Sequence, residues 1–261
     1  MAVEYDGSAF VGFQFQPELR SVQSVLETAL SRIFEEPVKV AAAGRTDTGV
    51  HASGQVVSFT TARSSFPFDR LALALNSALP NDVSVRDAAI VDPEFSARFS
   101  AVERSYVYAI FNRREPSALS ATRAYHVYAA LDLDAFGDAA AHLIGRHDFR
   151  SFCGTPPENG NTVRTVKTLT VRRSGQLIRV GISADGFVHR MVRTVVGTLI
   201  ECASGRRDPA TMPSILDARM RSAAGLTAPA HGLYLAGVRY RDGYDSFGEP
   251  PLTCNSGVEF E

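Results

Sequence analysis

Cysteine is scarce in this sequence, and no long uncharged apolar run occurs in its 261 residues. The three cysteines, Cys153, Cys202 and Cys254, are odd in number, widely spaced and never form a CxxC pair. This pattern argues against a disulfide framework and a structural zinc site, and it fits a reducing cytosol. The lack of an apolar run or a basic-then-apolar leader argues against a membrane span and secretion. We therefore expect a cytoplasmic protein with no membrane partner.

Lysine is also rare, because only Lys39 and Lys167 occur among the 27 basic residues. The net charge is −1, yet residues 98–207 carry sixteen Lys and Arg against nine Asp and Glu. A basic middle region suits phosphate contacts, and arginine guanidinium groups also stack on bases. A GC-rich genome would favour the same arginine usage. The charge pattern alone therefore decides little between a nucleic-acid partner and codon bias.

The hydrophobic pattern predicts one order of elements twice, in a chain whose 45% hydrophobic content is ordinary for a globular protein. The first series is a strand at 2–5, a helix at 21–36 with Ser21 as its N-cap, strands at 38–43 and 54–61, a helix at 68–79 and a strand at 83–91. The second series is a strand at 97–111, a helix at 132–145 closed by Gly145, a hairpin of 165–173 and 177–184, a helix at 187–203 and a strand at 233–240.

Two β-α-β-β-α-β series predict an α+β fold. We expect two ferredoxin-like halves that share one mixed, mainly antiparallel sheet, with the helices packed on one face. The N-terminal half would span residues 1–97 and the C-terminal half 98–247. Residues 248–261 show no periodic pattern, so we expect a loose tail.

The segment "GRTDTGVHA", Gly44 to Ala52, contains the Asp-Thr-Gly tripeptide of aspartic proteases. Those enzymes need two carboxylates that share one proton, whereas this chain has a single such turn. Arg45, two residues before Asp47, would also hold that carboxylate charged, which does not suit a proton-sharing pair. A simple glycine-flanked turn is the plain alternative, but flexibility alone does not require Arg, Asp and His together.

A set of segments in fixed order carries a more specific signal. They are "EYDGSAFVGFQFQPELRSVQSVLETAL", "GRTDTGVHASGQVVSF", "ARFSAVERSYVY", "DFRSF", "FVHRMVRTVVG" and "HGLYL". Together they resemble the tRNA pseudouridine synthase A family, from about Tyr5 to Tyr240. The resemblance implies an RNA-modifying isomerase that converts uridine to pseudouridine at positions 38 to 40 of the tRNA anticodon arm. It also implies two ferredoxin-like halves, a homodimer and no cofactor.

By this resemblance, Asp47 is the essential carboxylate of a reaction that breaks the N1 glycosidic bond and rejoins uracil through C5. The carboxylate either attacks covalently or removes a ribose proton to give a glycal, and the sequence leaves both routes open. A cation would stabilise the charge of such a screened carboxylate. Arg193 of "HRMVR" is the candidate, because Met191, Val192, Val195 and Val196 around it predict a buried neighbourhood. A solvated helix face or a structural ion pair is the alternative for Arg193.

The target uridine must leave its stack, and the resemblance assigns further residues to this step. Arg45 would fill the vacated position or hold the displaced nucleotide. Tyr106 would stack on the flipped base, although a core position is the alternative, as it is for Tyr108 on the same strand face. Leu233 resembles the apolar wall of the uracil pocket, and an ordinary core leucine would look the same.

The remaining candidates are weaker. Arg20 and Arg104 are candidate RNA contacts. His51 is another, although a hydrogen bond that fixes its own loop is the favoured role. The acidic and histidine residues at 132–148 fit a helix N-cap and a solvated face better than a metal site, which would need three converging ligands. The rival function is an RNA-binding or chaperone module of the same fold without catalysis.

Overall fold

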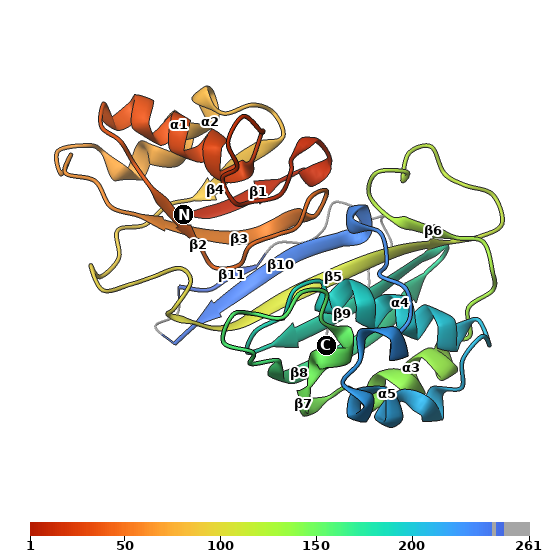
Figure 1. Cartoon of the computed structure of the whole chain (residues 1–261). Helices are drawn as coiled ribbons and strands as arrows, with labels where there is room; N and C mark the ends of the chain where they lie inside the picture. The colour runs from red at the N-terminus through yellow and green to blue at the C-terminus, as the bar shows by residue number, and fades with distance from the viewer. Residues whose placement is uncertain (242–243, 248–261) are drawn as a thin grey trace. The chain divides into compact units, whose positions relative to one another are not determined.

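A computed structural model describes residues 1–241 and 244–247 of the chain (Figure 1). The tail that we predicted to be loose, residues 248–261, lies outside the described residues. The chain forms two compact units. Among the described residues, the first unit comprises Met1–Arg104 with the stretch from Tyr234 onward, and the second comprises Ser105–Leu233. Packing defines these units, and the predicted division into halves at residue 97 stays a prediction.

The first unit contains the predicted β-α-β-β-α-β series. Its elements are β1 (Ala2–Tyr5), α1 (Val22–Phe34), β2 (Val40–Ala42), β3 (His51–Phe59), α2 (Leu71–Ala78) and β4 (Val83–Asp87), joined by β10 (Leu233–Tyr240) and β11 (Ser246–Phe247). Strand β1 lies between β3 and β4 and is antiparallel to both, and β2 is antiparallel to β3. Strand β10 pairs in parallel with β3 at His51 and Ala52, so this sheet is mixed. Helices α1 and α2 lie together on one side of it (Figure 1).

Helix α1 shows why the sequence forms this layer. Ser21 is its N-cap as predicted, and its side chain accepts a hydrogen bond from the Ser24 N–H in a capping box. Leu26, Leu30 and Phe34 follow at four-residue spacing and are fully buried. One face of the helix therefore joins the core, as its sequence period predicts.

The second unit contains most of the second series. Its elements are β5 (Ala101–Asn112, which begins in the first unit), β6 (Tyr125–Val127), α3 (Leu133–Ala141), β7 (Gly145–Asp148), β8 (Val163–Ser174), β9 (Leu177–Ala184), α4 (Met191–Ala203) and α5 (Met212–Ala218). The strand order is β5-β9-β8-β7, with β8 antiparallel to both β7 and β9. Helix α3 packs against α4 and β8. Helices beside a mixed sheet confirm the predicted α+β class.

Two predicted helices each differ from the structure by four residues at one end. The helix predicted at 132–145 ends at Ala141, and Gly145, with a φ of +104°, instead begins β7 and pairs with Val166. The helix predicted at 187–203 begins at Met191, because Arg190 takes a left-handed φ of 60° that breaks the helical geometry. Arg193 consequently lies in the first turn of α4. The sequence pattern did not predict β6, β7 or α5.

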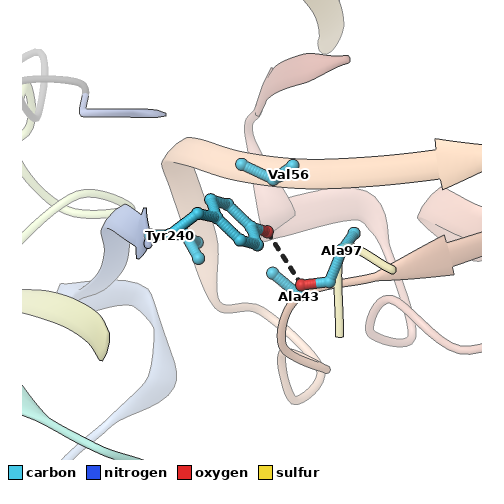
Figure 2. Packing of buried hydrophobic residues seen from close by; sticks show 5 residues of the cluster. Ala43, Val56, Ala97 and Tyr240 are labelled. Carbon is cyan, nitrogen blue, oxygen red and sulfur yellow. Dashed lines mark hydrogen bonds between the residues drawn. The ribbon is translucent and has the colours of Figure 1, made fainter. Parts of the chain in front are cut away.

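A small core of the first unit borders the GRTDTG segment. Figure 2 shows Tyr240 packed with Ala43, Val56 and Ala97, and Val238 completes the cluster. The Tyr240 hydroxyl donates a 2.8 Å hydrogen bond to the Ala97 carbonyl. Ala43 immediately precedes Gly44, so the GRTDTG segment begins directly after a residue of this buried cluster. Among the helices that the structure describes, none is long and apolar enough to cross a membrane.

Candidate active site

The Asp-Thr-Gly sequence forms a tight turn that leads into β3. The Val50 N–H donates to the Asp47 carbonyl at 3.1 Å, which closes a four-residue turn. Gly49 occupies its third position with a φ of +77°, a conformation that glycine adopts without steric cost. The tripeptide therefore serves a turn here, as the plain interpretation of the sequence held, and this leaves the Asp47 side chain to be accounted for.

Alternate residues of this segment are anchored to the rest of the first unit. The Gln55 amide donates to the Gly44 carbonyl at 2.7 Å, and the Thr46 hydroxyl is 2.8 Å from the Tyr5 hydroxyl. The Thr46 carbonyl also accepts a 3.0 Å hydrogen bond from the N–H of Phe13. The residues between and after these anchors, Arg45 and Asp47, are exposed and half-buried respectively. The backbone of the loop is therefore fixed while these two side chains extend from it.

The approach of the neighbouring loop to Thr46 is unusually close. Gly12 has a φ of +106°, and a Cβ built on it would lie 2.8 Å from the Thr46 carbonyl oxygen. Only glycine fits this position without moving backbone. Residues 12 and 13 thus hold the segment from one side.

His51 fixes the start of β3. Its ring is 1% exposed, and its Nδ1 accepts a 3.0 Å hydrogen bond from the Gly7 N–H. The Asp6 carboxylate also lies 3.1 Å from the same ring nitrogen. The ring also stacks on Tyr234, with centroids 4.7 Å apart. These are the loop-fixing contacts favoured from the sequence, and RNA binding by His51 stays a prediction.

The three candidate arginines of the first unit differ in their surroundings. Arg45 is exposed, and its guanidinium forms no hydrogen bond or ion pair within the described part of the chain. Arg20 forms a two-pronged pair with the Asp82 carboxylate at 2.7 Å and lies over the Phe10 ring. Arg104 donates to the backbone carbonyls of residues 43, 98 and 101. Of the three, only Arg45 is without such a contact among the described residues.

The two strand tyrosines of the second unit are both buried. Tyr106 is 8% exposed and meets the Phe187 ring edge-on, with centroids 5.0 Å apart. Tyr108 is fully buried, as expected for a core residue, and its hydroxyl donates to the Pro229 carbonyl at 2.7 Å. Burial raises the pKa of the Tyr108 hydroxyl well above its usual range, although the nearby Arg193 charge opposes this. Tyr108 is therefore a structural donor, while the stacking role of Tyr106 remains a prediction.

Arg193 is half-buried at the start of α4, beside a segment that leads into β10. Its Nε donates to the Ala228 carbonyl at 2.8 Å, and the Ala228 N–H donates back to the Arg193 carbonyl. This contact fixes the plane of the guanidinium. Burial, together with the Arg193 charge, lowers the pKa of His231, even though a hydrogen bond with the Ala124 backbone opposes the shift. The apolar neighbourhood predicted for Arg193 is confirmed, since its four apolar neighbours on the helix are 1–4% exposed.

Leu233 begins β10 and is 5% exposed. The glycine before it has a packing reason: a Cβ on Gly232 would lie 2.7 Å from the Tyr108 ring. The HGLYL segment therefore passes close to the buried Tyr108 ring at Gly232. The structure thus places Arg45 and Asp47 on one loop of the first unit, with His51 at the start of the strand that follows, and Tyr106, Arg193 and Leu233 in the second unit.

Sequence reasoning missed the residues that hold the loop, chiefly Tyr5 and Gln55. The signal was present, because Gln55 is a polar residue within a strand whose neighbours are fully buried. A buried amide needs partners, and the turn-forming GRTDTG segment supplies them. Among the described residues, no group of three or more His, Cys, Asp or Glu side chains is arranged to hold a metal ion.

The comparisons with known proteins bear on this site directly. A model of the family described as tRNA pseudouridine synthase matches residues 1–100 and 139–241. tRNA pseudouridine synthase A of Halalkalibacterium halodurans is 44% identical over 234 residues, which cover 89% of each chain. The Bacillus subtilis protein of that name is 42% identical over 240 residues, covering 91% of this chain and 97% of its own. That of Moorella thermoacetica is 44% identical over 242 residues, covering 92% and 98%.

A solved chain of a Cbf5-Nop10-Gar1 complex aligns with 90% of this chain and 57% of its own, at 12% identity and a TM-score of 0.34. A likeness of that size bears on neither fold nor function. The family match, in contrast, contains the loop with Arg45 and Asp47 as well as the segments with Arg193 and Leu233. The chain belongs to the tRNA pseudouridine synthase family.

Proposed function

We propose that this chain converts uridine to pseudouridine at positions 38 to 40 of the tRNA anticodon arm, with Asp47 as the essential carboxylate. Family membership carries the proposal and confirms its coarser part: the chain is an isomerase that forms pseudouridine in tRNA. The anticodon-arm positions and the residue roles rest on the family resemblance and on the chemistry of the side chains.

The reaction requires a group that acts at the ribose without water. The N1–C1′ bond breaks, the uracil turns, a C5–C1′ bond forms, the hydrogen at C5 leaves as a proton, and N1 takes up a proton. Asp47 acts either as a nucleophile that forms a covalent adduct or as a base that removes a ribose proton. Both routes need a carboxylate held in one orientation, and the anchored backbone on either side of Arg45 supports this.

The proposal gives the other predicted residues the following roles. Arg45, exposed beside Asp47, occupies the space that the extruded nucleotide leaves or holds that nucleotide. Tyr106 stacks on the flipped base, which offsets part of the extrusion cost because such stacking contributes about 1–3 kcal/mol per base. Leu233 forms the apolar wall of the uracil pocket. Arg193 is the candidate cationic partner of the essential carboxylate, and its fixed guanidinium plane suits that role.

The cellular setting follows the same proposal. We expect a homodimer that binds the anticodon stem-loop of tRNA in the cytoplasm and uses no cofactor. Arg20, His51 and Arg104 are the weaker candidates for RNA contact. Arg20 and Arg104 would have to give up their present hydrogen bonds to bind a phosphate, so they are better suited to stabilising the first unit.

Tritium release tests the activity and the positions together. Wild-type protein is incubated with tRNA transcripts that carry 5-tritiated uridine, in which uridines 38, 39 and 40 are replaced by cytidine one at a time and all together. The proposal expects release from the parent transcript and none above background from the triple replacement. Release that persists in the triple replacement would place the target elsewhere in the tRNA.

The rival function, an RNA-binding or chaperone module without catalysis, is separated by the same assay. Such a module would bind the transcript but release no tritium, because only isomerisation displaces the C5 hydrogen. A protein that binds RNA without catalysis also has no use for an anchored Asp47 loop.

A further inference from the structure

A buried chain of hydrogen bonds lies behind the Asp47 loop, and the reaction outlined above assigns it no task. It consists of Tyr5, Gln55 and Thr46, which are 3%, 0% and 7% exposed. The Gln55 amide nitrogen donates to the Gly44 carbonyl at 2.7 Å and approaches the Tyr5 hydroxyl at 3.4 Å. The Tyr5 hydroxyl in turn lies 2.8 Å from the Thr46 hydroxyl.

The amide of Gln55 is fully used in this arrangement. Its oxygen accepts from the backbone N–H groups of Gly44 at 3.4 Å and Val56 at 3.2 Å. An amide nitrogen has two hydrogens, and both are accounted for by Gly44 and Tyr5. The Tyr5 hydroxyl thus links the Gln55 amide to the Thr46 hydroxyl. Burial raises the pKa of Tyr5 to about 12, which keeps this hydroxyl protonated at neutral pH.

The hydrogen bonds of Tyr5 and Gln55 meet the Asp47 loop at Gly44 and Thr46, the residues that precede Arg45 and Asp47. Thr46 is 7% exposed, whereas Arg45 is exposed and Asp47 is half-buried. Residues 44 and 46 are therefore held from the interior, while residues 45 and 47 lie nearer the surface. The Thr46 carbonyl is held separately by the Phe13 N–H, so both ends of that residue are fixed.

The energetics favour a positional role over general stability. A buried polar group that loses its partner costs about 1–3 kcal/mol, so each member of the chain penalises a displaced loop. An apolar contact would stabilise the unit equally well but would tolerate small shifts, because it has no directionality. Aspartate chemistry at the ribose does not tolerate them, since a misplacement of about 1 Å costs roughly 100-fold in rate.

We infer that Tyr5, Thr46 and Gln55 are positioning residues that set the orientation of the Asp47 carboxylate through the loop backbone. This inference rests on the proposed function. We expect substitutions of these three residues to slow the chemical step and to leave tRNA affinity intact, because none of the three side chains reaches the surface.

The test compares single-turnover tritium release and tRNA affinity in matched variants. Tyr5→Phe removes one hydroxyl oxygen from the chain. Tyr240→Phe is the control, because Tyr240 is also 3% exposed in the same unit and its hydroxyl bonds to Ala97 instead of the loop. Tyr5→Phe should slow the single-turnover rate by about 10- to 100-fold, with tRNA affinity within about twofold of wild type. Tyr240→Phe should leave both within about twofold.

Thr46 provides the second arm. Thr46→Val removes the hydroxyl at nearly constant volume, while Thr46→Ser keeps it. Thr46→Val should match Tyr5→Phe, Thr46→Ser should recover most of the rate, and the double variant should be no slower than the slower single one. If Tyr5→Phe does not fold, as judged by circular dichroism and thermal unfolding, the Thr46 pair carries the test alone.

Each remaining outcome has a defined meaning. Equal rates for Tyr5→Phe and Tyr240→Phe, or a Thr46→Ser variant as slow as Thr46→Val, would overturn the inference. A loss of tRNA affinity without a loss of rate would also overturn it. Wild-type protein that releases no tritium would instead refute the proposed function, so the two failures are distinguishable.

Discussion

Tyr5 and Thr46 are separated by 41 residues in sequence and joined by a buried 2.8 Å hydrogen bond between their hydroxyl groups. Through this bond the last residue of β1 holds the residue next to Asp47. The first strand of the chain, which contributes no reacting group, therefore fixes the backbone of the proposed catalytic loop. This arrangement links the stability of the first unit to the geometry of its most reactive segment.

Ionisation of the Tyr5 hydroxyl should lower the stability of the folded protein at alkaline pH. Its pKa is about 12 in the folded state, because of burial, against 10.0 for the exposed group. The raised pKa means that its stabilisation is complete below pH 10 and is lost as the pH rises from 10 to 12. The loss amounts to about 2–3 kcal/mol. The unfolding free energy of wild type minus that of Tyr5→Phe, measured with denaturant, should therefore fall steadily across this range. A value that does not change with pH would contradict the assignment.

Gly12 tests the close approach to the loop. Gly12→Ala combines the strain of a positive φ, about 1–2 kcal/mol, with overpacking against the Thr46 carbonyl, about 1–3 kcal/mol. Gly160→Ala is the matched control, because Gly160 has a φ of +66° and open space around it. Thermal unfolding should show the larger loss for Gly12→Ala, and tritium release should fall in that variant alone. Equal stability losses would show that the approach to Thr46 has no energetic weight.

Arg45 and Arg104 should differ in what their removal affects. Arg45→Ala removes an exposed side chain, so stability should change by less than about 0.5 kcal/mol. The slope of tRNA affinity against salt concentration should fall by about one unit if one phosphate contact is lost. Arg104→Ala leaves three backbone carbonyls without their charged donor, so it should cost about 2 kcal/mol of stability. The reverse pattern, with stability loss at Arg45 and slope loss at Arg104, would contradict these roles.

Arg193→Lys separates charge from geometry at the start of α4. Lysine keeps the positive charge but lacks the Nε–H that fixes Arg193 on the Ala228 carbonyl. We expect a loss of about tenfold or more in single-turnover rate, with the fold retained. Arg190→Lys is the control, because Arg190 is exposed outside the helix. An unchanged rate in Arg193→Lys would show that charge alone is required there.

Much of the fold was predictable because its signals are local. The Ser21 cap, the apolar stripe of α1 and the hairpin of β8 and β9 all arise from residues close in sequence. The end of α3 was predicted wrongly. A glycine at the end of a helical pattern looks like a C-cap even when it belongs to the next strand. Gly145 pairs with Val166, and that competition is not visible in a local pattern.

The candidate site divides in the same way. Asp47 and Arg45 could be chosen as candidates because a specific set of segments accompanies them. The residues that hold their loop were missed, because Tyr5 and Gln55 are joined to it only by tertiary hydrogen bonds. For Arg20 and Arg104, sequence indicated a positive charge but could not indicate that Asp82 and three backbone carbonyls would engage it.

The most direct test of the account is single-turnover tritium release by Asp47→Asn, measured beside its tRNA affinity. The asparagine side chain preserves shape and removes the charge. The account predicts tRNA binding within about twofold of wild type and release reduced by at least about 1,000-fold. A folded Asp47→Asn protein that releases tritium at the wild-type rate would contradict the assignment of Asp47 as the essential carboxylate.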